Sequence, residues 1–560
     1  MSKIIGKVLA TEKNPSTMEE FYFWTKPDLI LNPFDVVKVE HINDSITYGV
    51  IEEISHITDT ANFLSDFISN DFGELNTSFF TNRVSMNYVK AKIIGNSQNI
   101  YIPVLNSKEV CIANKEEVLF ALGLNTIKNP IPCGYIEMYQ GADITDRIKI
   151  CVNIDSNFLI GPEAAHLNIS GISGLAAKTS YAMFLLKAIQ DKNLNLQSEE
   201  DDTDVAFVIF NVKGKDLLAI HEENLFENSE EEKEVFQLYK EMGMSTRPFK
   251  NVHYYYPYSD NNVWNTYLEP ETVNKNIDNE IAQMYKYEYE KDKDNLDLMF
   301  ASLDDPTQTM DSILNYIITN QGNFGRLSNW HEFIEEVQSH SQAGNKSSDK
   351  EITVQSWRKF ARIIKKSIYQ NNIFTDIQNR KKEIRINDAL KKIKKNEVHV
   401  IDISKLNDDM QSFVFGDAVR TIYDLKLGQE ITDNEPPSKV IIFIDELNKY
   451  ASSDVPKNSP ILRQVLDIAE RGRSLGVILF AAEQFKSAIH PRVTGNCSTF
   501  AYGRTNSIEL AKNDYKFIPS IYKSIMARLK QGEYIIQNPV FNSLLNVKFP
   551  KPIYKQFKSK

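Results

Sequence analysis

Hydrophobic and polar positions alternate in two different ways along this 560-residue chain. Roughly the first 110 residues carry short β-rich runs between turns, a pattern typical of a small β-barrel. These runs are Ile4 to Ala10, Val36 to Glu40, Ile46 to Ile54, Val84 to Gly95 and Asn99 to Val104. Farther along, apolar runs alternate with helix-like segments, which predicts βαβ units and a parallel sheet.

The second region contains strand-like and helix-like runs in turn. The strand-like runs are Val205 to Phe210, Asn251 to Pro257, Glu397 to Ile403 and Val477 to Ala482. The helix-like runs are Tyr181 to Ile189, Met410 to Leu425 and Ile461 to Ala469. A long polar, helix-rich stretch from 278 to 395 interrupts the alternation, so we expect an α/β core with a large helical insertion.

One further strand-like run ends in two carboxylates. Val440 to Ile444 is followed directly by Asp445 and Glu446. Five apolar residues in a row predict a strand covered on both faces, and ligands of α/β sheets bind at the carboxyl ends of such strands. There Asp445 is suited to hold Mg²⁺, and Glu446 to take a proton from the water that attacks a γ-phosphate. The alternative is a core strand followed by a helix N-terminus, whose dipole favours carboxylates.

Residues 166–180 have the order of strand, glycine-containing loop, Lys-Thr pair and helix that a phosphate-binding loop needs. Loop N–H groups and the helix N-terminus would hold the phosphates, Lys178 would reach the β and γ oxygens, and Thr179 would ligate Mg²⁺. The candidate ATP-binding residues are Gly171, Gly174, Ala177, Lys178, Thr179 and Ser180. The alternative is a plain strand-turn-helix in which the Lys-Thr pair occurs by chance. The presence of Asp445 and Glu446 in the same chain makes this alternative less favoured.

The loop departs from the pattern G-x-x-x-x-G-K-[ST]. Ile172 and Ala177 stand where the two glycines are expected, and aligning Gly171 with the first of them needs one extra loop residue. Alanine resists a positive φ and carries a Cβ near the phosphates. We therefore expect nucleotide binding, whereas rapid hydrolysis does not follow from the motif.

Three polar residues beyond the acid pair complete the candidate catalytic set. Gln484 follows the strand-like run that ends at Ala482, where an amide is placed to contact a γ-phosphate or the attacking water. Arg471 and Arg473 precede that run and are candidate arginine fingers for a neighbouring subunit's nucleotide. The alternatives are a solvated helix end, where cations are favoured, and a solvent-facing amide.

Composition narrows the class of protein. The chain is 42% apolar and 25% charged, as soluble proteins are, and its length predicts two or three structural units. It shows no apolar run of about 18 residues and no signal-peptide core, so we expect a cytoplasmic protein without a membrane segment. Its four cysteines lack C-x-x-C spacing, which supports neither a disulfide framework nor a zinc site. A net charge of −11 argues against a uniformly basic nucleic-acid binder, but not against a local basic channel.

The ordered set of these motifs resembles the HerA branch of the HerA/FtsK P-loop ATPases along nearly the whole chain. Motifs of that family fall at Lys178-Thr179, Asn211 to Asp216, Asp445-Glu446, Arg471-Gly472-Arg473, Gln484, and Asn496 with Gly503-Arg504. Similarity to the HerA-type N-terminal barrel lies at Ile5 to Val8, Pro33 to Val37 and Tyr48 to Ile51.

The resemblance implies an α/β chain with an N-terminal small β-barrel and a RecA-like P-loop ATPase core that carries a large helical insertion. The implied boundaries are 1–140 for the barrel, 141–277 for the first part of the core with the P-loop, and 278–395 for the insertion. Residues 396–560 would form the second part of the core, with the Walker B strand, the arginine finger and a C-terminal segment.

The resemblance also implies a function. Such ATPases form homo-hexameric rings that hydrolyse ATP with Mg²⁺ at subunit interfaces and move or unwind duplex DNA. Some work with an effector, either a nuclease or a sirtuin-like NAD-hydrolysing protein, in DNA processing or anti-phage defence. We recognise no nuclease or NAD-hydrolysing centre in this chain, so that chemistry would belong to a partner.

A second hypothesis is a nucleotide-stabilised ring that assembles and activates an effector with little ATPase activity of its own. Ile172, Ala177 and Asn211 favour it, because Asn211 stands where the family commonly has Asp. The intact Asp445-Glu446 pair favours the motor, since a scaffold needs no general base.

Two segments are rich in Lys and Arg. They comprise Arg358, Lys359, Arg362, Lys365 and Lys366, and then Arg380, Lys381, Lys382, Arg385, Lys391, Lys392, Lys394 and Lys395. Pore loops of a DNA-threading ring need such residues to contact phosphates. A charged helix face in solvent is the commoner explanation for the second segment, so neither enters the candidate site.

Overall fold

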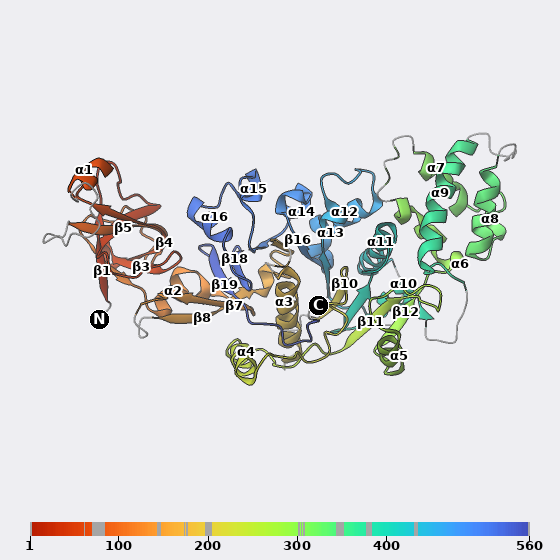
Figure 1. Cartoon of the computed structure of the whole chain (residues 1–560), viewed down its shortest axis with the longest axis horizontal. Coiled ribbons are helices and arrows are strands. Elements are labelled where there is room, and N and C mark those ends of the chain that lie inside the picture. The colour runs from red at the N-terminus through yellow and green to blue at the C-terminus, as the bar shows by residue number, and fades with distance from the viewer. Residues whose placement is uncertain are drawn as a thin grey trace. The chain divides into compact units, whose positions relative to one another are not determined.

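The computed structural model describes residues 3–60, 62–69, 84–142, 147–172, 174, 177–195, 204–300, 303, 305, 308–342, 352–376, 383–429 and 435–557. The chain divides into two compact units, coloured along the chain in Figure 1. The first comprises Met1–Asp155 and Asn506–Phe549, and the second comprises Ser156–Thr505 and Pro550–Lys560. The four domain boundaries expected from the sequence stay predictions.

A closed antiparallel barrel forms the N-terminal part of the first unit, as predicted. Its strands follow the order β1-β2-β5-β4-β3-β6. They are β1 (Ile4–Leu9), β2 (Glu20–Thr25), β3 (Val36–Glu40), β4 (Ile46–Thr58), β5 (Ser85–Asn96) and β6 (Glu109–Ile112). Alternate residues such as Phe21, Phe23 and Val89 point inward and are fully buried, which gives the barrel its own apolar core.

One barrel strand expected from the sequence is wrong, and two were missed. Asn99 to Val104 forms no strand, because Asn99 has φ 57° and Pro103 lacks a backbone donor. Tyr101 and Ile102 are consequently exposed. The barrel closes instead through β6 and through β2, whose run of aromatic residues alternates between the two faces of the wall.

The first unit contains a second, antiparallel group of strands in the order β18-β19-β7-β8. These are β7 (Pro130–Met138), β8 (Ile148–Asp155), β18 (Glu533–Gln537) and β19 (Leu545–Lys548). The unit's helices are α1 (Phe63–Ser69), α2 (Lys115–Ala121), α15 (Ser507–Leu510) and α16 (Ser520–Met526). Buried Tyr139 joins this group to the barrel, since its N–H donates to Asp35 at 2.8 Å and its hydroxyl lies 2.6 Å from the Val36 carbonyl.

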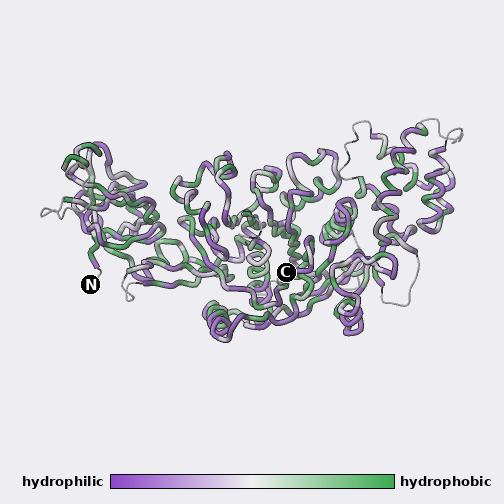
Figure 2. The backbone as a smooth tube through the Cα atoms, viewed as in Figure 1, coloured by the Kyte–Doolittle hydropathy of each residue, from purple (hydrophilic) through white to green (hydrophobic). Residues whose placement is uncertain are grey.

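A parallel sheet organises the second unit. Its described strands follow the order β13-β12-β11-β14-β10-β15-β16-β9-β17. They are β9 (Leu167–Ser170), β10 (Val205–Asn211), β11 (Val252–Pro257), β12 (Ala282–Tyr285), β13 (Glu383–Ile384), β14 (Val398–Asp402), β15 (Lys439–Asp445), β16 (Val477–Glu483) and β17 (Thr499–Tyr502). Strands β10 and β16 are buried at every residue, as their continuous apolar runs predict, and Figure 2 shows the hydrophobic colour along the central strands.

Helices cover both faces of this sheet. They are α3 (Lys178–Asn195), α4 (Ser229–Glu241), α5 (Pro270–Asp278), α6 (Tyr289–Asp292), α7 (Thr309–Ile318), α8 (Trp330–His340), α9 (Val354–Asn371), α10 (Ile386–Leu390), α11 (Asp408–Lys426), α12 (Asn448–Ala451), α13 (Pro460–Leu475) and α14 (Pro491–Thr494). Helices α11 and α13 share one apolar core with Val208, Ile442 and Leu479 of the sheet. No helix in the described parts of the chain is long and apolar enough to cross a membrane.

The region expected to be a helical insertion holds α6 to α10, so its helical character is confirmed. It differs from the expectation in one respect, because β12 and β13 extend the parallel sheet. Its apolar residues, among them Leu296, Phe333 and Trp357, join the same core as α11 and α13. The insertion is therefore packed as part of the second unit. The overall fold class predicted from the sequence is confirmed.

Strand order brings three strand ends together. Strand β16 lies between β9, which leads into the glycine-containing loop, and β15, which ends in the acid pair. Glu483 pairs with Ser170 and Ala482 with Asp445, so the carboxyl ends of all three strands meet at one edge of the sheet. Ligands of α/β proteins bind at such an edge.

Candidate nucleotide site

The candidate phosphate loop connects β9 to α3. Its start is fixed by two backbone hydrogen bonds, from the Gly171 N–H to the Glu483 carbonyl (3.2 Å) and from the Ile172 N–H to the Arg504 carbonyl (2.8 Å). Gly174 has φ 79°, and a Cβ built there would meet no atom within 4 Å. Ser173, Leu175 and Ala176 of the predicted loop lie outside the described residues.

Ala177 occupies the last loop position before α3 and has φ 46°, in the left-handed region. This is the position where the phosphate-loop pattern has glycine, and an L residue with a Cβ is strained there by about 1–2 kcal/mol. The Ala177 carbonyl nevertheless accepts the first helical bond, from the Tyr181 N–H at 3.0 Å. The chain therefore forms the turn that a glycine would make and accepts the strain.

Lys178 and Thr179, the first residues of α3, both point into the site. Lys178 Nζ donates to the Gly171 carbonyl at 3.1 Å, and burial lowers the pKa of this amine although Asp445 and Glu446 lie nearby. Thr179 Oγ1 donates to Asp445 Oδ2 at 3.0 Å across 266 residues of sequence. Burial raises the pKa of Asp445, against the opposing charge of Lys178.

The hydroxyl of Thr179 and the carboxylate of Asp445 are hard oxygen donors at one point in space, which is the donor chemistry that Mg²⁺ prefers. The helix N-terminus beside them presents backbone N–H groups without intrahelical partners, which suit phosphate oxygens. Ser180, also expected to bind ATP, lies near the Tyr554 hydroxyl instead. The residues present therefore fit a Mg²⁺-nucleotide, with Ser180 the weakest member of the set.

Glu446 is held by an ion pair in this structure. Lys213 Nζ lies 2.5 Å from Glu446 Oε1, and Glu446 itself has φ 60°. Burial alone would raise the pKa of Glu446, but the hydrogen bond and charge of Lys213 bring it below its ordinary value. Gln484 lies close enough to the Glu446 carboxylate to lower that pKa further. Glu446 and Gln484 are thus brought together, as the sequence predicted.

Asn211 plays a structural part that the sequence did not reveal. Its Nδ2 donates to Asp402 Oδ1 at 2.9 Å and to the Gly214 carbonyl at 2.9 Å. Asp402 is fully buried and also accepts from Thr266 and Ser404. An Asp at position 211 would place a second carboxylate against the first, so Asn suits this chain.

Arg471 and Arg473 lie elsewhere. They lie near the C-terminal end of α13, whose last residue, Leu475, is followed by the C-cap Gly476 (φ 75°) just before β16 begins. Because β16 is 7 residues long, they are about 20 Å from the edge where its partner strands end. Both arginines are exposed, and Arg473 also donates to the Glu163 carbonyl of its own chain. Neither arginine reaches the nucleotide site of its own subunit.

Sequence reasoning gave no role to three charged residues of the site, although two of them, Lys213 and Asp216, lie within the motif Asn211 to Asp216. Lys213 follows β10. Because Phe210 of β10 pairs with Ile444 of β15, the residues just after the two strands, Lys213 and Glu446, lie close together. Asp216 lies near Asp445, and burial together with that neighbour's charge raises its pKa. Glu483, at the tip of β16, is fully buried, and burial raises its pKa well above the ordinary value. The register between β10 and β15 places Lys213 beside Glu446, and a single sequence does not display that register.

Scans against protein-family models and curated proteins found no match to this chain. Some solved structures are similar to it. The bacterial conjugative coupling protein TrwBdeltaN70 is 10% identical over 73% of this chain and 90% of its own, with a TM-score of 0.35. EssC (ATPases 2 and 3) from Geobacillus thermodenitrificans is 11% identical over 76% of this chain and 45% of its own, with a TM-score of 0.28. The genome packaging NTPase B204 from Sulfolobus turreted icosahedral virus 2 is 16% identical over 29% and 70%, with a TM-score of 0.21.

At these TM-scores the similarity to solved structures does not support an argument about the fold. The fold is therefore assigned from the strand order of this chain. The central strands follow the order β17-β9-β16-β15-β10, with the loop strand and the acid-pair strand separated by β16. The carboxyl ends of these strands carry Lys178, Thr179, Asp445 and Glu446 within one site. The chain thus has the fold of a P-loop ATPase, as its resemblance to the HerA/FtsK ATPases predicts.

Proposed function

We propose that this protein is an ATP-hydrolysing, homo-hexameric ring of the DNA translocase or helicase type. The observation that carries the proposal is the contact of Thr179 Oγ1 with Asp445 Oδ2 at 3.0 Å. It joins the Lys-Thr pair to the acid pair, and Lys178 and Glu446 lie beside it. A core strand with a chance acid pair would not bring these four side chains together.

Each residue has a defined task in this proposal. Lys178 must leave the Gly171 carbonyl to reach the phosphates, while Thr179 and Asp445 would hold the cation. Bound ATP would supply the phosphoanhydride bond. Bound Mg²⁺ would neutralise the charge that develops on the phosphate oxygens. Glu446 accepts the proton of the attacking water once Lys213 releases its carboxylate, and Gln484 orients that water or senses its loss.

The position of the arginines supports a ring. A transition state for phosphoryl transfer benefits from an arginine finger, and neither Arg471 nor Arg473 reaches its own site. Exposed Arg471 is the better candidate to act on the next subunit, because Arg473 is engaged by Glu163. We propose that Arg471 completes the site in trans and that DNA passes through the ring.

A partner effector, a nuclease or a sirtuin-like NAD-hydrolysing protein in anti-phage defence or DNA processing, completes the proposal. The second candidate function is a nucleotide-stabilised scaffold for such an effector. Two observations favour it: Ala177 is strained at φ 46°, and Lys213 occupies Glu446. Both features slow turnover without preventing nucleotide binding.

The test combines two measurements on the purified full chain. ATP turnover is measured with and without duplex DNA, and the mass of the particle is measured by light scattering with and without ATP. DNA-stimulated turnover by a six-subunit particle supports the motor. A hexamer that binds ATP but hydrolyses none, with or without DNA, supports the scaffold.

A further inference from the structure

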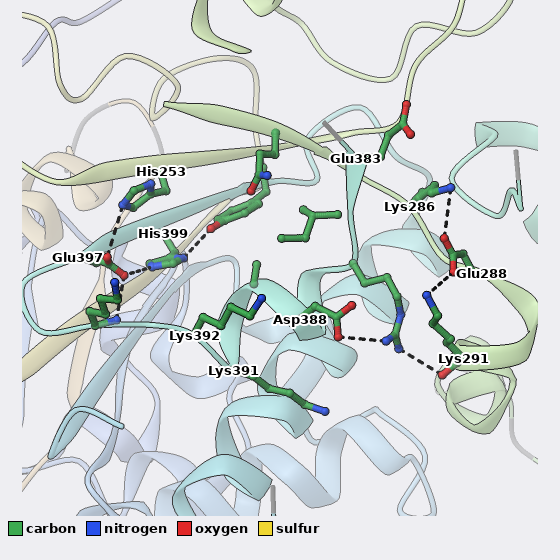
Figure 3. A pocket seen from close by; sticks show the side chains of 16 residues that line it. His253, Lys286, Glu288, Lys291, Glu383, Asp388, Lys391, Lys392, Glu397 and His399 are labelled. Carbon is green, nitrogen blue, oxygen red and sulfur yellow. Dashed lines mark hydrogen bonds and ion pairs between the residues drawn. The ribbon is translucent and has the colours of Figure 1, made fainter. Parts of the chain in front are cut away.

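A second cavity lies in the outer part of the parallel sheet, away from the nucleotide site. It has a volume of about 640 Å³ and is bordered by β11, β12, β13, β14 and α10. Four strand spacings separate β14 from β9, so the cavity is roughly 20 Å or more from the phosphate loop. Figure 3 shows charged side chains from these elements converging on it.

The lining carries an excess of positive charge. Six cationic side chains face four carboxylates in the cavity, although the whole chain has a net charge of −11. The cations are Lys286, Lys291, Arg385, Lys391, Lys392 and Lys394, four of them from the basic segment that the sequence singled out. Arg380, Lys381 and Lys382 of that segment lie outside the described residues.

Two carboxylates of the lining, Glu288 and Asp388, form ion pairs with cations that also line the cavity. Glu288 pairs with Lys286 at 3.3 Å and with Lys291 at 2.7 Å. Arg385 pairs with Asp388 at 3.2 Å and with buried Asp292, which lies outside the lining, at 2.5 Å. Lys392 and Lys394 are exposed, and neither ammonium forms an ion pair with any residue that the structure describes. Two cations therefore remain available to a ligand after the internal pairs are made.

The opposite wall is a fixed hydrogen-bond chain. Glu397 accepts from His399 Nε2 at 3.0 Å and from the Lys394 backbone N–H at 2.8 Å. Because a carboxylate only accepts, His399 Nε2 carries the proton, and Nδ1 accepts from the Tyr255 hydroxyl at 2.9 Å. The Lys286 and His399 side chains are only 5% and 4% exposed, so these walls are held in place before any ligand arrives.

From this geometry we propose that the cavity binds a small molecule carrying several phosphate groups, at a site separate from the phosphate loop. The excess charge selects an anion, and several cations around one cavity suit several phosphates. The volume is that of a small-molecule site. Glu288 and Asp388 also line the cavity, and they disfavour a continuous nucleic-acid backbone, which needs an unbroken basic track. The proposal does not depend on ATP hydrolysis.

The experiment uses inorganic triphosphate as the probe and the full chain with Lys178→Ala, which removes the lysine of the phosphate loop. Isothermal titration without Mg²⁺ should detect one site per chain. Lys392→Ala with Lys394→Ala, added to this background, should weaken binding by about tenfold or more, since each removes one charge-assisted contact. The matched control is Lys365→Ala with Lys366→Ala, two exposed lysines of α9 outside the cavity, which should leave binding unchanged.

Three results would overturn the proposal. The cavity is excluded as a site if the Lys178→Ala protein binds no triphosphate. It is also excluded if the two double variants, Lys392→Ala with Lys394→Ala and Lys365→Ala with Lys366→Ala, weaken binding equally. A single-stranded oligonucleotide is titrated in parallel. Binding of the oligonucleotide that depends on Lys392 and Lys394, without binding of triphosphate, would assign the cavity to nucleic acid instead. Circular dichroism confirms that the variants are folded.

Discussion

Lys213 Nζ lies 2.5 Å from Oε1 of Glu446, the expected general base. The two residues are 233 positions apart in sequence and are brought together because β10 and β15 are neighbours in the sheet. A carboxylate in an ion pair is a weaker base and is held in one orientation. The structure therefore shows the site with its base restrained.

Removing this restraint should change the rate. Lys213→Ala leaves the carboxylate without its cation, so the pKa of Glu446 should rise from its lowered value. We expect faster ATP turnover without DNA, and an acid limb of the pH–rate profile that moves to higher pH. Lys215→Ala is the matched control, since Lys215 lies on the same loop and contacts the ring of Phe557. Slower turnover in Lys213→Ala would mean that this lysine assists the reaction.

Ala177→Gly tests the strain in the loop. Glycine removes a left-handed strain of about 1–2 kcal/mol but adds about 0.4–1 kcal/mol of chain entropy in the unfolded state, so the net gain is between about 0 and 1.6 kcal/mol. Urea unfolding measures it, and nucleotide affinity should rise because the Cβ is gone. Ala182→Gly, at a buried interior position of α3, should destabilise the protein instead. Equal effects of the two substitutions would contradict the assigned strain.

Asn211→Asp tests whether this departure from the family pattern limits catalysis. A carboxylate at 211 would face Asp402 Oδ1, which is now 2.9 Å from the Asn211 amide. Two buried carboxylates cannot both ionise at low cost, so we expect a lower melting temperature and no gain in turnover. The exchange of both residues, Asn211→Asp with Asp402→Asn, should recover much of the loss. A stable, faster Asn211→Asp enzyme would show that Asn211 is the catalytic defect.

Asp417 makes stability depend on pH. Burial, followed by the charge of Asp292, raises the pKa of Asp417 to about 7, above the ordinary 3.8. The neutral carboxyl of Asp417 contributes fully to stability below about pH 4, and this contribution is lost as the pH rises through 7, at a cost of roughly 4 kcal/mol.

Asp417→Asn should abolish that loss, because an amide stays neutral and lies near the Tyr287 hydroxyl. Urea unfolding from pH 4 to pH 8 measures it. The expected result is a variant that equals the wild type at pH 4 and exceeds it at pH 8. Asp278→Asn, an exposed position in α5, should show no such difference. An unchanged pH dependence in Asp417→Asn would remove this carboxyl as the cause.

The sequence predicts the parts of this protein whose signal is local. Strands β10, β15 and β16 are found to within a residue or two, because every residue is apolar when both faces are covered. The strand predicted at Asn99 to Val104 was wrong because Asn99, within this β-rich run, has a left-handed backbone conformation. Single-residue backbone choices of that kind leave no periodic trace.

The candidate site likewise contains some residues that could be predicted from the sequence and others that could not. Lys178, Thr179, Asp445 and Glu446 could be predicted because each follows a strand with the expected spacing. Lys213 could not, since an exposed lysine after a strand is ordinary until the register of two strands places it beside Glu446. The pairing of Asn211 with Asp402 likewise depends on the neighbouring position of β10 and β14. Register is a long-range property that one sequence does not display.

The most direct test of the central claim is steady-state ATP hydrolysis by the purified chain, comparing wild type with Glu446→Gln in the presence of Mg²⁺ and duplex DNA. Loss of a general base should lower turnover by about 100-fold or more while ATP stays bound, because Thr179, Asp445 and Lys178 are untouched. Filter binding of labelled ATP verifies that the variant keeps its nucleotide. Turnover that is measurable in the wild type and unchanged in Glu446→Gln would contradict the account, since the base would then lie elsewhere.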